Sequence, residues 1–297
     1  MRLPQGVIIG AMKCGTSTLA AQLGAQPGMF LSDPKEPNFF SDDTNYDRGL
    51  EWYASLFEAA QPDDLMIEAS THYTKMPRHP ATLERLRPVL TDARFVYVMR
   101  QPIDRLISQY VHEWTVRKVP SPTRGVIDEA VRANQWMIDY GRYAMQIEPW
   151  LSAFGPERVL PVFAERLRAR PEAELERIAQ HLGYREQTRW LRLEDRNVSS
   201  ERLRISGARD LLLNVPVLKQ IRRGLVPQGL RDRVKSAWQM RERPKLSDAY
   251  RAVLEAAYDE DLARLGTLLG LAEDELTCAT FEGAAVGRTY DFMGAMR

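Results

Sequence analysis

The sequence predicts an α/β protein: a single domain with a central parallel sheet flanked by helices. Three segments carry this prediction, because in each of them a short apolar run is followed by residues with helical periodicity; they span residues 6–23, 94–114 and 159–182. Alternating strands and helices of this kind form parallel sheets with helices on their faces. We detect no internal repeat, low-complexity tract or linker, so we expect one domain over residues 1–297.

The composition is ordinary for a protein that works in water. Apolar residues make up 44% and charged residues 27%, and the net charge is +1. A net charge this small gives the protein no overall positive potential that would attract nucleic acid, so any anion-binding site must be local. The N-terminus shows no leader pattern, and no apolar stretch reaches the ~20 residues that cross a bilayer. We expect a cytoplasmic protein in which Cys14 and Cys278, which lack metal-ligand spacing, are reduced thiols.

The first segment predicts a strand, a loop and the start of a helix. The strand runs from Val7 to Ile9, and apolar residues recur at helical spacing from Thr16 onward. The start of a helix has free backbone N–H groups and a positive dipole end, and here Lys13 and three hydroxyl side chains add donors; the hydroxyls belong to Thr16, Ser17 and Thr18. These features predict a phosphate site.

The spacing of this loop differs from that of the common nucleotide triphosphate loop. Lys13 precedes Gly15 instead of following it, and only four residues separate Gly10 from Gly15. Taken alone, the loop is equally compatible with an ordinary strand-to-helix connection.

Two further segments place polar residues near the carboxyl edge of the sheet. Residues 33–40 form a proline-flanked polar turn that carries Lys35 and Glu36, and by itself this reads as a surface loop. A helix over residues 52–57 follows, and then a buried strand over residues 65–67. That strand leads into Glu68 and His72, which its position makes candidate site residues, although a lone histidine is more often structural.

The second strand–helix segment has Arg100 at the end of its strand. Pro102 suits the first position of the next helix, and Ser108 lies further along that helix. An enzyme that uses a nucleotide triphosphate usually ends such a strand in an acidic residue that holds Mg²⁺. The arginine favours a phosphate clamp over a kinase or ATPase, although an isolated arginine at a strand end more often reaches solvent.

The rest of the chain reads mainly as structural. We expect helices over residues 125–140, 143–154, 171–182 and 247–270, and a strand over residues 159–163 in which Pro161 indicates an edge position or an early end of the strand. Residues 202–245 are rich in arginine and lysine, and residues 271–297 form an extension to which the sequence assigns no role.

Three motifs resemble those of the sulfotransferases that use 3′-phosphoadenosine 5′-phosphosulfate (PAPS). Residues 13–18, Lys-Cys-Gly-Thr-Ser-Thr, resemble the 5′-phosphosulfate loop of that family. Arg100 and Ser108 lie eight positions apart, as in its 3′-phosphate motif. The stretch Lys-Glu-Pro-Asn-Phe-Phe at residues 35–40 is similar to one found in glycan sulfotransferases such as those acting on heparan sulfate. The resemblance covers about residues 6–270 and implies a P-loop-NTPase-like fold.

The resemblance also implies roles for individual residues. The donor PAPS would bind through Lys13, Cys14, Gly15, Thr16, Ser17 and Thr18 at its 5′ end and through Arg100 and Ser108 at its 3′-phosphate, with no metal. Glu36 would be the general base, Lys13 would stabilise the leaving phosphate, and His72 would be a reserve base. Arg202 and Arg204 would be additional ligands of the 3′-phosphate.

The acceptor stays open at this point. It would be a hydroxyl or an amine of a saccharide, a lipid or a small metabolite, and Ala69 stands where many glycan sulfotransferases have lysine. Two other functions remain: a phosphotransferase that uses Mg²⁺ and ATP, and a non-catalytic module that binds a nucleotide or a glycan. The oligomeric state is equally open.

Overall fold

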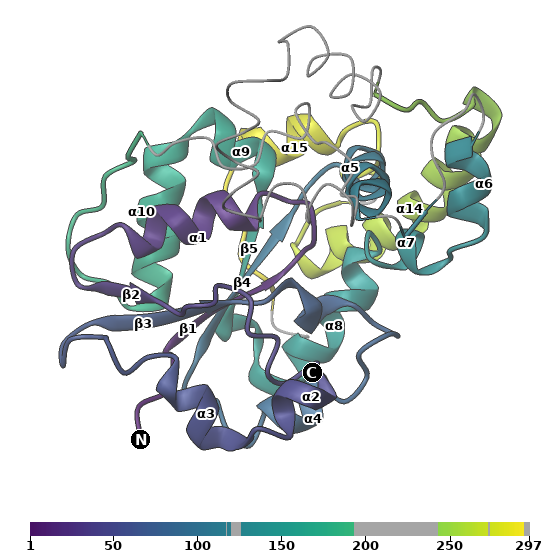
Figure 1. The fold of residues 1–297 in the computed structure, drawn as a ribbon. Helices are drawn as coiled ribbons and strands as arrows, with labels where there is room; N and C mark the ends of the chain where they lie inside the picture. The colour runs from purple at the N-terminus through teal and green to yellow at the C-terminus, as the bar shows by residue number, and fades with distance from the viewer. Residues whose placement is uncertain (117, 120–125, 193–242, 273, 294–297) are drawn as a thin grey trace, which may run out of the picture.

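A computed structural model describes residues 1–116, 118–119, 126–192, 243–272 and 274–293 of the chain (Figure 1). The predicted phosphate ligands Arg202 and Arg204, and most of the basic segment 202–245, lie outside these residues.

The described residues contain a five-stranded sheet in which every neighbouring pair of strands is parallel, in the order β2-β3-β1-β4-β5. The strands are β1 (Gly6–Gly10), β2 (Met29–Leu31), β3 (Leu65–Ala69), β4 (Arg94–Met99) and β5 (Val159–Phe163). The predicted fold class is therefore confirmed. Strand β5 lies at an edge, as Pro161 predicted, because proline cannot donate a hydrogen bond to a further strand.

Helices cover both faces of the sheet (Figure 1). Helices α1 (Thr16–Gly24) and α10 (Pro171–Leu182) lie on one face, and α3 (Gly49–Ser55), α4 (Thr82–Leu86) and α8 (Tyr143–Phe154) lie on the other. The remaining helices are α2 (Asp43–Tyr46), η1 (Thr71–Thr74), α5 (Pro102–Thr115), α6 (Val126–Arg132), α7 (Trp136–Asp139), η2 (Pro156–Arg158), α9 (Ala164–Ala169), α14 (Asp248–Leu268) and α15 (Phe281–Gly287).

Two of the predicted helices are wrong in extent. The helix expected over residues 125–140 is two helices, α6 and α7, and the amide of Asn134 lies between them, where it donates to the carbonyl of Ala130 at 2.8 Å and accepts from the Trp136 indole at 3.1 Å. At the break, these side-chain hydrogen bonds take the place of the backbone hydrogen bonds of a continuous α-helix. The helix expected over residues 52–57 starts earlier and ends at Ser55, although Tyr53 and Phe57 are buried as its pattern predicted.

The C-terminal segment, to which the sequence assigned no role, completes the core. Phe281 at the start of α15 is fully buried, and its ring contacts Phe163 at the end of β5 and Tyr143 at the start of α8. The ring of Tyr290 also packs on Phe163. These residues therefore pack on the side chain that ends β5 and extend the core there.

Among the helices of the described ranges, no helix combines the length and the hydropathy needed to cross a membrane.

Candidate functional site

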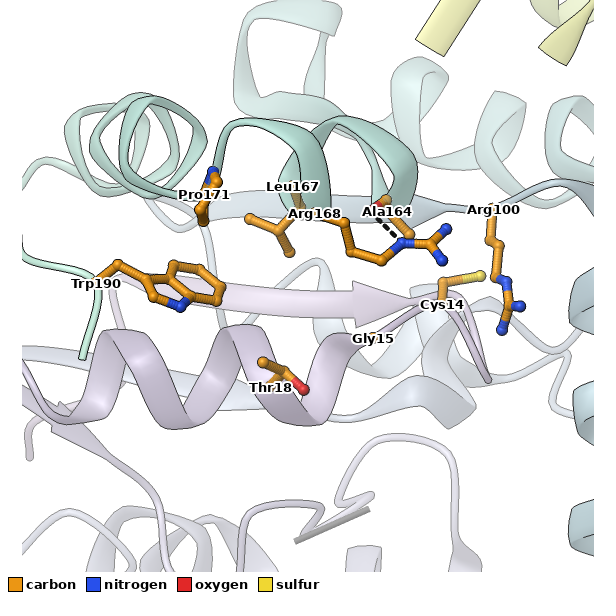
Figure 2. Close-up of a pocket in the computed structure, with 9 residues that line it drawn as sticks. All are labelled: Cys14, Gly15, Thr18, Arg100, Ala164, Leu167, Arg168, Pro171 and Trp190. Atoms are coloured by element: carbon orange, nitrogen blue, oxygen red, sulfur yellow. Dashed lines mark hydrogen bonds between the residues drawn. The ribbon is translucent and has the colours of Figure 1, made fainter. Parts of the chain in front are cut away.

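The candidate site lies where β1 and β4 end side by side in the sheet. Strand order reverses around β1, since the chain moves from β1 to β2 and β3 on one side and then to β4 on the other. Ligands of open parallel sheets bind at such a point, beyond the carboxyl ends of the strands. A cavity of about 350 Å³ lies there, lined by Cys14, Gly15, Thr18, Arg100, Ala164, Leu167, Arg168, Pro171 and Trp190 (Figure 2).

The loop after β1 is shaped by two glycines. A side chain at Gly10 would come within 1.9 Å of the Thr74 hydroxyl oxygen, so the close approach of η1 requires glycine. Gly15 precedes α1 with a left-handed φ of 89°, a conformation that glycine adopts without steric cost. The Ala11 N–H donates to the Val98 carbonyl at 2.7 Å and ties the loop to β4. These contacts fix the loop, and the loop in turn fixes the position of the free backbone N–H groups at the start of α1.

Cys14 is a buried packing residue of this loop. Its side chain is fully buried, and its Sγ lies 3.7 Å from the Tyr143 hydroxyl. Burial raises the pKa of the thiol to about 11, against smaller lowering effects of Arg105 and Tyr143. The side chain is therefore a neutral thiol at physiological pH, and both cysteines are free, as the sequence predicted.

Arg100 is held at the end of β4 by Tyr143. The Tyr143 hydroxyl accepts from the Arg100 N–H at 3.1 Å and donates to its carbonyl at 2.5 Å. The Arg100 guanidinium lies 3.4 Å from Asp104, while its buried Nε has no hydrogen-bond partner among the described residues. An unpaired buried donor of a cation is a strong anion ligand.

Ser108 is a buried residue of α5. That helix starts as predicted: Pro102 is its first residue, and the Gln101 side chain caps it by accepting from the Asp104 N–H at 2.8 Å. The capped helix holds Ser108 two turns beyond Arg100, although Ser108 does not line the cavity that contains Arg100.

Glu36 is connected to the loop through Lys35. The Lys35 ammonium donates to the Ser17 hydroxyl of α1 at 3.0 Å and to a Glu36 carboxylate oxygen at 2.8 Å, and the other oxygen accepts from Thr71 at 3.2 Å. Burial by itself would raise the Glu36 pKa, but Lys35, Lys75 and the Thr71 hydrogen bond together hold that pKa below its usual value. Glu36 is therefore ionised at neutral pH and lies beside the loop that begins α1.

His72 is an uncharged neighbour of Glu36. Burial, with the charge of Lys75, lowers the His72 pKa to about 3, and its ring stacks on His79 at 4.7 Å between centroids. Its buried Nδ1 has no hydrogen-bond partner in the described parts of the chain. A neutral imidazole of such low basicity accepts a proton poorly at neutral pH.

Glu68 differs from its expected position. Strand β3 continues to Ala69, so Glu68 lies within the sheet and is fully buried. Its carboxylate accepts from the hydroxyls of Tyr53 and Ser70, and burial raises its pKa. These contacts join β3 to α3 and give Glu68 a structural role in the core.

Sequence reasoning missed Lys35, Lys75 and Glu113. Lys75 is 6% exposed, its ammonium lies 5.6 Å from the centre of the Tyr140 ring, and burial lowers its pKa to about 8. Glu113 of α5 is 3% exposed, and although the charges of Lys118 and Lys75 oppose it, burial raises the pKa of its carboxyl group. Glu113 lies three residues after Tyr110 and seven after Leu106, on the apolar face of α5, and this spacing could have flagged it. Lys75 follows a short 3₁₀ turn and carries no local signal.

The described residues contain no group of three or more histidine, cysteine, aspartate or glutamate side chains that could hold a metal ion.

Comparison with known proteins identifies the family. Residues 3–206 match the model of the sulfotransferase domain. The chain belongs to the sulfotransferase domain family. It is 33% identical over 191 residues to mouse heparan sulfate glucosamine 3-O-sulfotransferase 3B1, a match that covers 61% of this chain and 46% of that protein. It is 26% identical over 198 residues to mouse bifunctional heparan sulfate N-deacetylase/N-sulfotransferase 4, covering 61% of this chain and 22% of that protein.

The matched region thus spans about half the length of the first relative and less of the second. Among solved structures, the fold is similar to that of a sulfotransferase from Alicyclobacillus acidocaldarius, with a TM-score of 0.62 and 22% identity over 92% of this chain and 98% of that one. The resemblance to the sulfotransferase family that the loop and Arg100 suggested is therefore confirmed, together with the sulfotransferase fold.

Proposed function

We propose that this protein transfers a sulfuryl group from PAPS to an acceptor hydroxyl or amine. One observation carries the donor assignment: the loop residues Cys14, Gly15 and Thr18 and the strand-end residue Arg100 line a single cavity. Two anion sites joined by one cavity suit a nucleotide that carries phosphate groups at both its 5′ and 3′ positions. Family membership and the start of α1 at this loop support the same donor.

The residues around the cavity fit such a donor. The buried Nε of Arg100 without a partner among the described residues is a donor that an incoming phosphate would satisfy. The N–H groups at the start of α1, with the hydroxyls of Thr16 and Ser17, would hold the 5′ end, and Ser108 would assist Arg100. The neutral thiol of Cys14 adds no negative charge against these anions.

PAPS supplies a sulfuryl group whose bond to the bridging oxygen is broken during transfer. Glu36 removes the proton of the acceptor, because its carboxylate is ionised at neutral pH and Lys35 holds it beside α1. Lys13 stabilises the negative charge that develops on the bridging oxygen. His72 lies near Glu36 as a neutral hydrogen-bonding group and orients the acceptor.

We propose a saccharide as the acceptor. The relatives reported above are named for heparan sulfate, one for transfer to a glucosamine hydroxyl and one for N-sulfation. The cationic side chains of Lys75 and Lys118 on the Glu36 side of the site suit a saccharide with acidic substituents.

The test is calorimetric titration of the purified chain with 3′-phosphoadenosine 5′-phosphate in the presence of a chelator, and separately with ATP and Mg²⁺. We expect tight binding of the bisphosphate without metal and much weaker binding of ATP. Preference for ATP with Mg²⁺ would overturn the donor assignment and favour a phosphotransferase. Incubation with radiolabelled PAPS and heparan sulfate oligosaccharides then tests the acceptor, and binding of the bisphosphate without label transfer to any oligosaccharide would overturn the saccharide assignment.

A further inference from the structure

We propose that Arg105, a buried arginine of α5, supplies the donor site with a positive charge that the fold leaves unbalanced and that the phosphate groups of the donor balance. This inference rests on the proposed function, because it concerns the anion that the same site would bind. It assigns a role to a residue that lies between Arg100 and Ser108 in the sequence but does not line the cavity.

The guanidinium of Arg105 is held in place by two uncharged groups. The side chain is fully buried, and it donates to the Gln109 amide oxygen at 2.6 Å and to the Met137 carbonyl at 2.5 Å. Its Nε has no hydrogen-bond partner among the described residues. Arginine keeps its charge in proteins, so these contacts orient the cation without neutralising it.

Two other arginines of low exposure differ from Arg105 because they have a counter-ion. The Arg166 guanidinium of α9 donates to the Glu174 carboxylate at 2.7 Å, and Arg177 of α10 reaches the same carboxylate at 2.9 Å. Arg105 forms no ion pair with a carboxylate in the described part of the chain. A buried charge costs free energy unless an opposite charge compensates it, so the ligand-free fold carries this cost.

Arg105 lies next to residues that hold the cavity wall in place. Its backbone belongs to the first turns of α5, which begins just beyond the end of β4. A side chain at Gly141 would come within 2.9 Å of its Nε. Two residues after that glycine, the Tyr143 hydroxyl bonds the backbone of Arg100 and lies 3.7 Å from the Cys14 Sγ. The cation therefore adjoins the groups that position both anion-binding parts of the site.

The charge of Arg105 acts on the loop that precedes α1. Burial raises the pKa of the Cys14 thiol, and among the cations that oppose this rise Arg105 has a larger effect than Arg100, which lines the cavity. A field that reaches Cys14 also acts on an anion bound beside it. Because the guanidinium is shielded from water, salt weakens this attraction less than it weakens the attraction of a surface charge.

An electrostatic role determines how the effect depends on the ligand. A residue that contacts one phosphate changes the affinity for ligands that carry this phosphate. An unbalanced charge in the interior instead favours every anionic group at the site, so its effect grows with the charge of the ligand. The contribution of Arg105 should therefore be largest for 3′-phosphoadenosine 5′-phosphate, smaller for AMP and absent for adenosine.

The direct test is Gln109→Glu, which replaces the amide that accepts from Arg105 by a carboxylate of the same shape. The hydrogen bond is kept, but the cation gains a counter-ion. By calorimetric titration we expect the affinity for 3′-phosphoadenosine 5′-phosphate to fall about tenfold, since a unit charge about 10 Å away at an effective dielectric constant of about 20 changes a binding constant by roughly this factor. The affinity for AMP should fall less, and that for adenosine should not change. An unchanged affinity for the bisphosphate would overturn the proposal, as would an equal loss for all three ligands.

Thermal unfolding of the ligand-free chain separates charge compensation from damage to the site. Gln109→Glu should unfold at a higher temperature than the wild type, because the new carboxylate compensates the buried charge. Weaker binding combined with a lower unfolding temperature would mean that the substitution distorts the site, and this result would count against the proposal.

Arg105→Met and Arg105→Lys give an independent test. Both remove the guanidinium and its hydrogen bonds, and their side chains have similar lengths, but only lysine keeps the charge. We expect Arg105→Lys to bind the bisphosphate about five- to tenfold more tightly than Arg105→Met; equal affinities would contradict an electrostatic role. Arg166→Met, which removes an arginine that has a counter-ion, is the control and should lower stability without changing the affinity for the bisphosphate. Gln109→Glu decides the question if neither variant of Arg105 folds.

These outcomes are separable from failure of the proposed function. A wild-type chain that binds no 3′-phosphoadenosine 5′-phosphate would overturn the donor itself. A wild type that binds it, together with a Gln109→Glu variant that binds it equally well, would overturn only the role of Arg105.

Discussion

The two halves of the candidate site are built in different ways. The proposed donor half, formed by the loop after β1, Arg100 and the cavity, is fixed by backbone hydrogen bonds and buried packing, such as the two contacts of the Tyr143 hydroxyl with Arg100. The proposed acceptor half consists of titratable side chains from separate segments, namely Glu36, His72, Lys75 and Glu113. Shape defines the first half, and mutual electrostatics define the second.

This difference has a physical reason. Phosphate groups have a fixed geometry and charge, so a preformed loop and a positioned arginine bind them without changes in protonation. Proton removal from an acceptor instead requires a base in the right charge state, and that state depends on every neighbouring charge. Substitutions in the donor half should therefore change affinity, and substitutions in the acceptor half should change rate and its dependence on pH.

Glu36→Gln gives the largest effect expected from this division. Removal of the proposed base lowers the rate of sulfuryl transfer by about 10²- to 10⁴-fold, while the affinity for 3′-phosphoadenosine 5′-phosphate stays within about threefold, because the amide keeps the shape of the carboxylate. Rates with radiolabelled donor and calorimetric titration measure the two quantities.

Glu51→Gln, on an exposed position of α3, is the control and should leave both quantities unchanged. An unchanged transfer rate in Glu36→Gln would show that Glu36 is not the base.

Arg100→Ala should show the opposite pattern, because its main effect should be on the affinity for 3′-phosphoadenosine 5′-phosphate. Loss of a charged hydrogen-bond donor weakens binding of 3′-phosphoadenosine 5′-phosphate by about 10- to 150-fold. Binding of AMP, which has no 3′-phosphate, should change little. Arg94→Ala at the opposite, exposed end of β4 removes the same charge as a control. Equal losses for AMP and the bisphosphate would assign Arg100 to a part of the nucleotide other than the 3′-phosphate.

The same division explains which features the sequence could predict. The parallel sheet, the loop at residues 10–15 and the start of α5 at Pro102 each come from a short contiguous segment, so periodicity and the placement of glycine and proline predicted them. Pro161 predicted the edge position of β5 for the same local reason.

The features that escaped prediction depend on contacts between distant segments. Lys35 reads as an ordinary solvated lysine until α1 brings Ser17 within 3.0 Å of its ammonium. Lys75 gains its low pKa only from burial among elements far apart in the sequence. The break between α6 and α7 depends on how the Asn134 side chain bonds, which competes with helix formation without altering the apolar pattern.

Lys75→Met is expected to separate stability from activity. The ordinary lysine pKa of 10.5 falls to about 8 in the folded chain, so below pH 8 the buried charge costs about 3 kcal/mol in the free energy of folding. The neutral variant should therefore unfold at a higher temperature than wild type at pH 7. The difference should shrink as pH rises from 8 to 10.5, because the unfolded wild type binds more protons than the folded one in this range.

Sulfuryl transfer should fall about tenfold in Lys75→Met, since the charge beside Glu36 is lost. In the wild type, the rate should decline above about pH 8 as Lys75 deprotonates. The charged and titratable groups near the Lys75 ammonium are those of Glu36, Glu113, Lys118, Arg78, His72 and His79. Lys75→Arg should keep its charge and remove that alkaline decline. Lys245→Met, on an exposed lysine to which no role in the site is assigned, is the control. An unchanged alkaline limb in Lys75→Arg would assign the decline to another group.

Tyr143→Phe should give the smallest of these effects, a modest one on both stability and donor affinity. The substitution removes a hydroxyl that serves both the N–H and the carbonyl of Arg100 and leaves these two groups unpaired, at a cost of about 1–3 kcal/mol in the free energy of unfolding. Tyr97→Phe is a close control, since the Tyr97 ring contacts the Tyr143 ring but its buried hydroxyl has no partner among the described residues. That variant should be as stable as wild type or slightly more stable. Denaturant unfolding and titration with 3′-phosphoadenosine 5′-phosphate measure both variants, and equal stability losses would mean that the Tyr143 hydroxyl does not hold the end of β4.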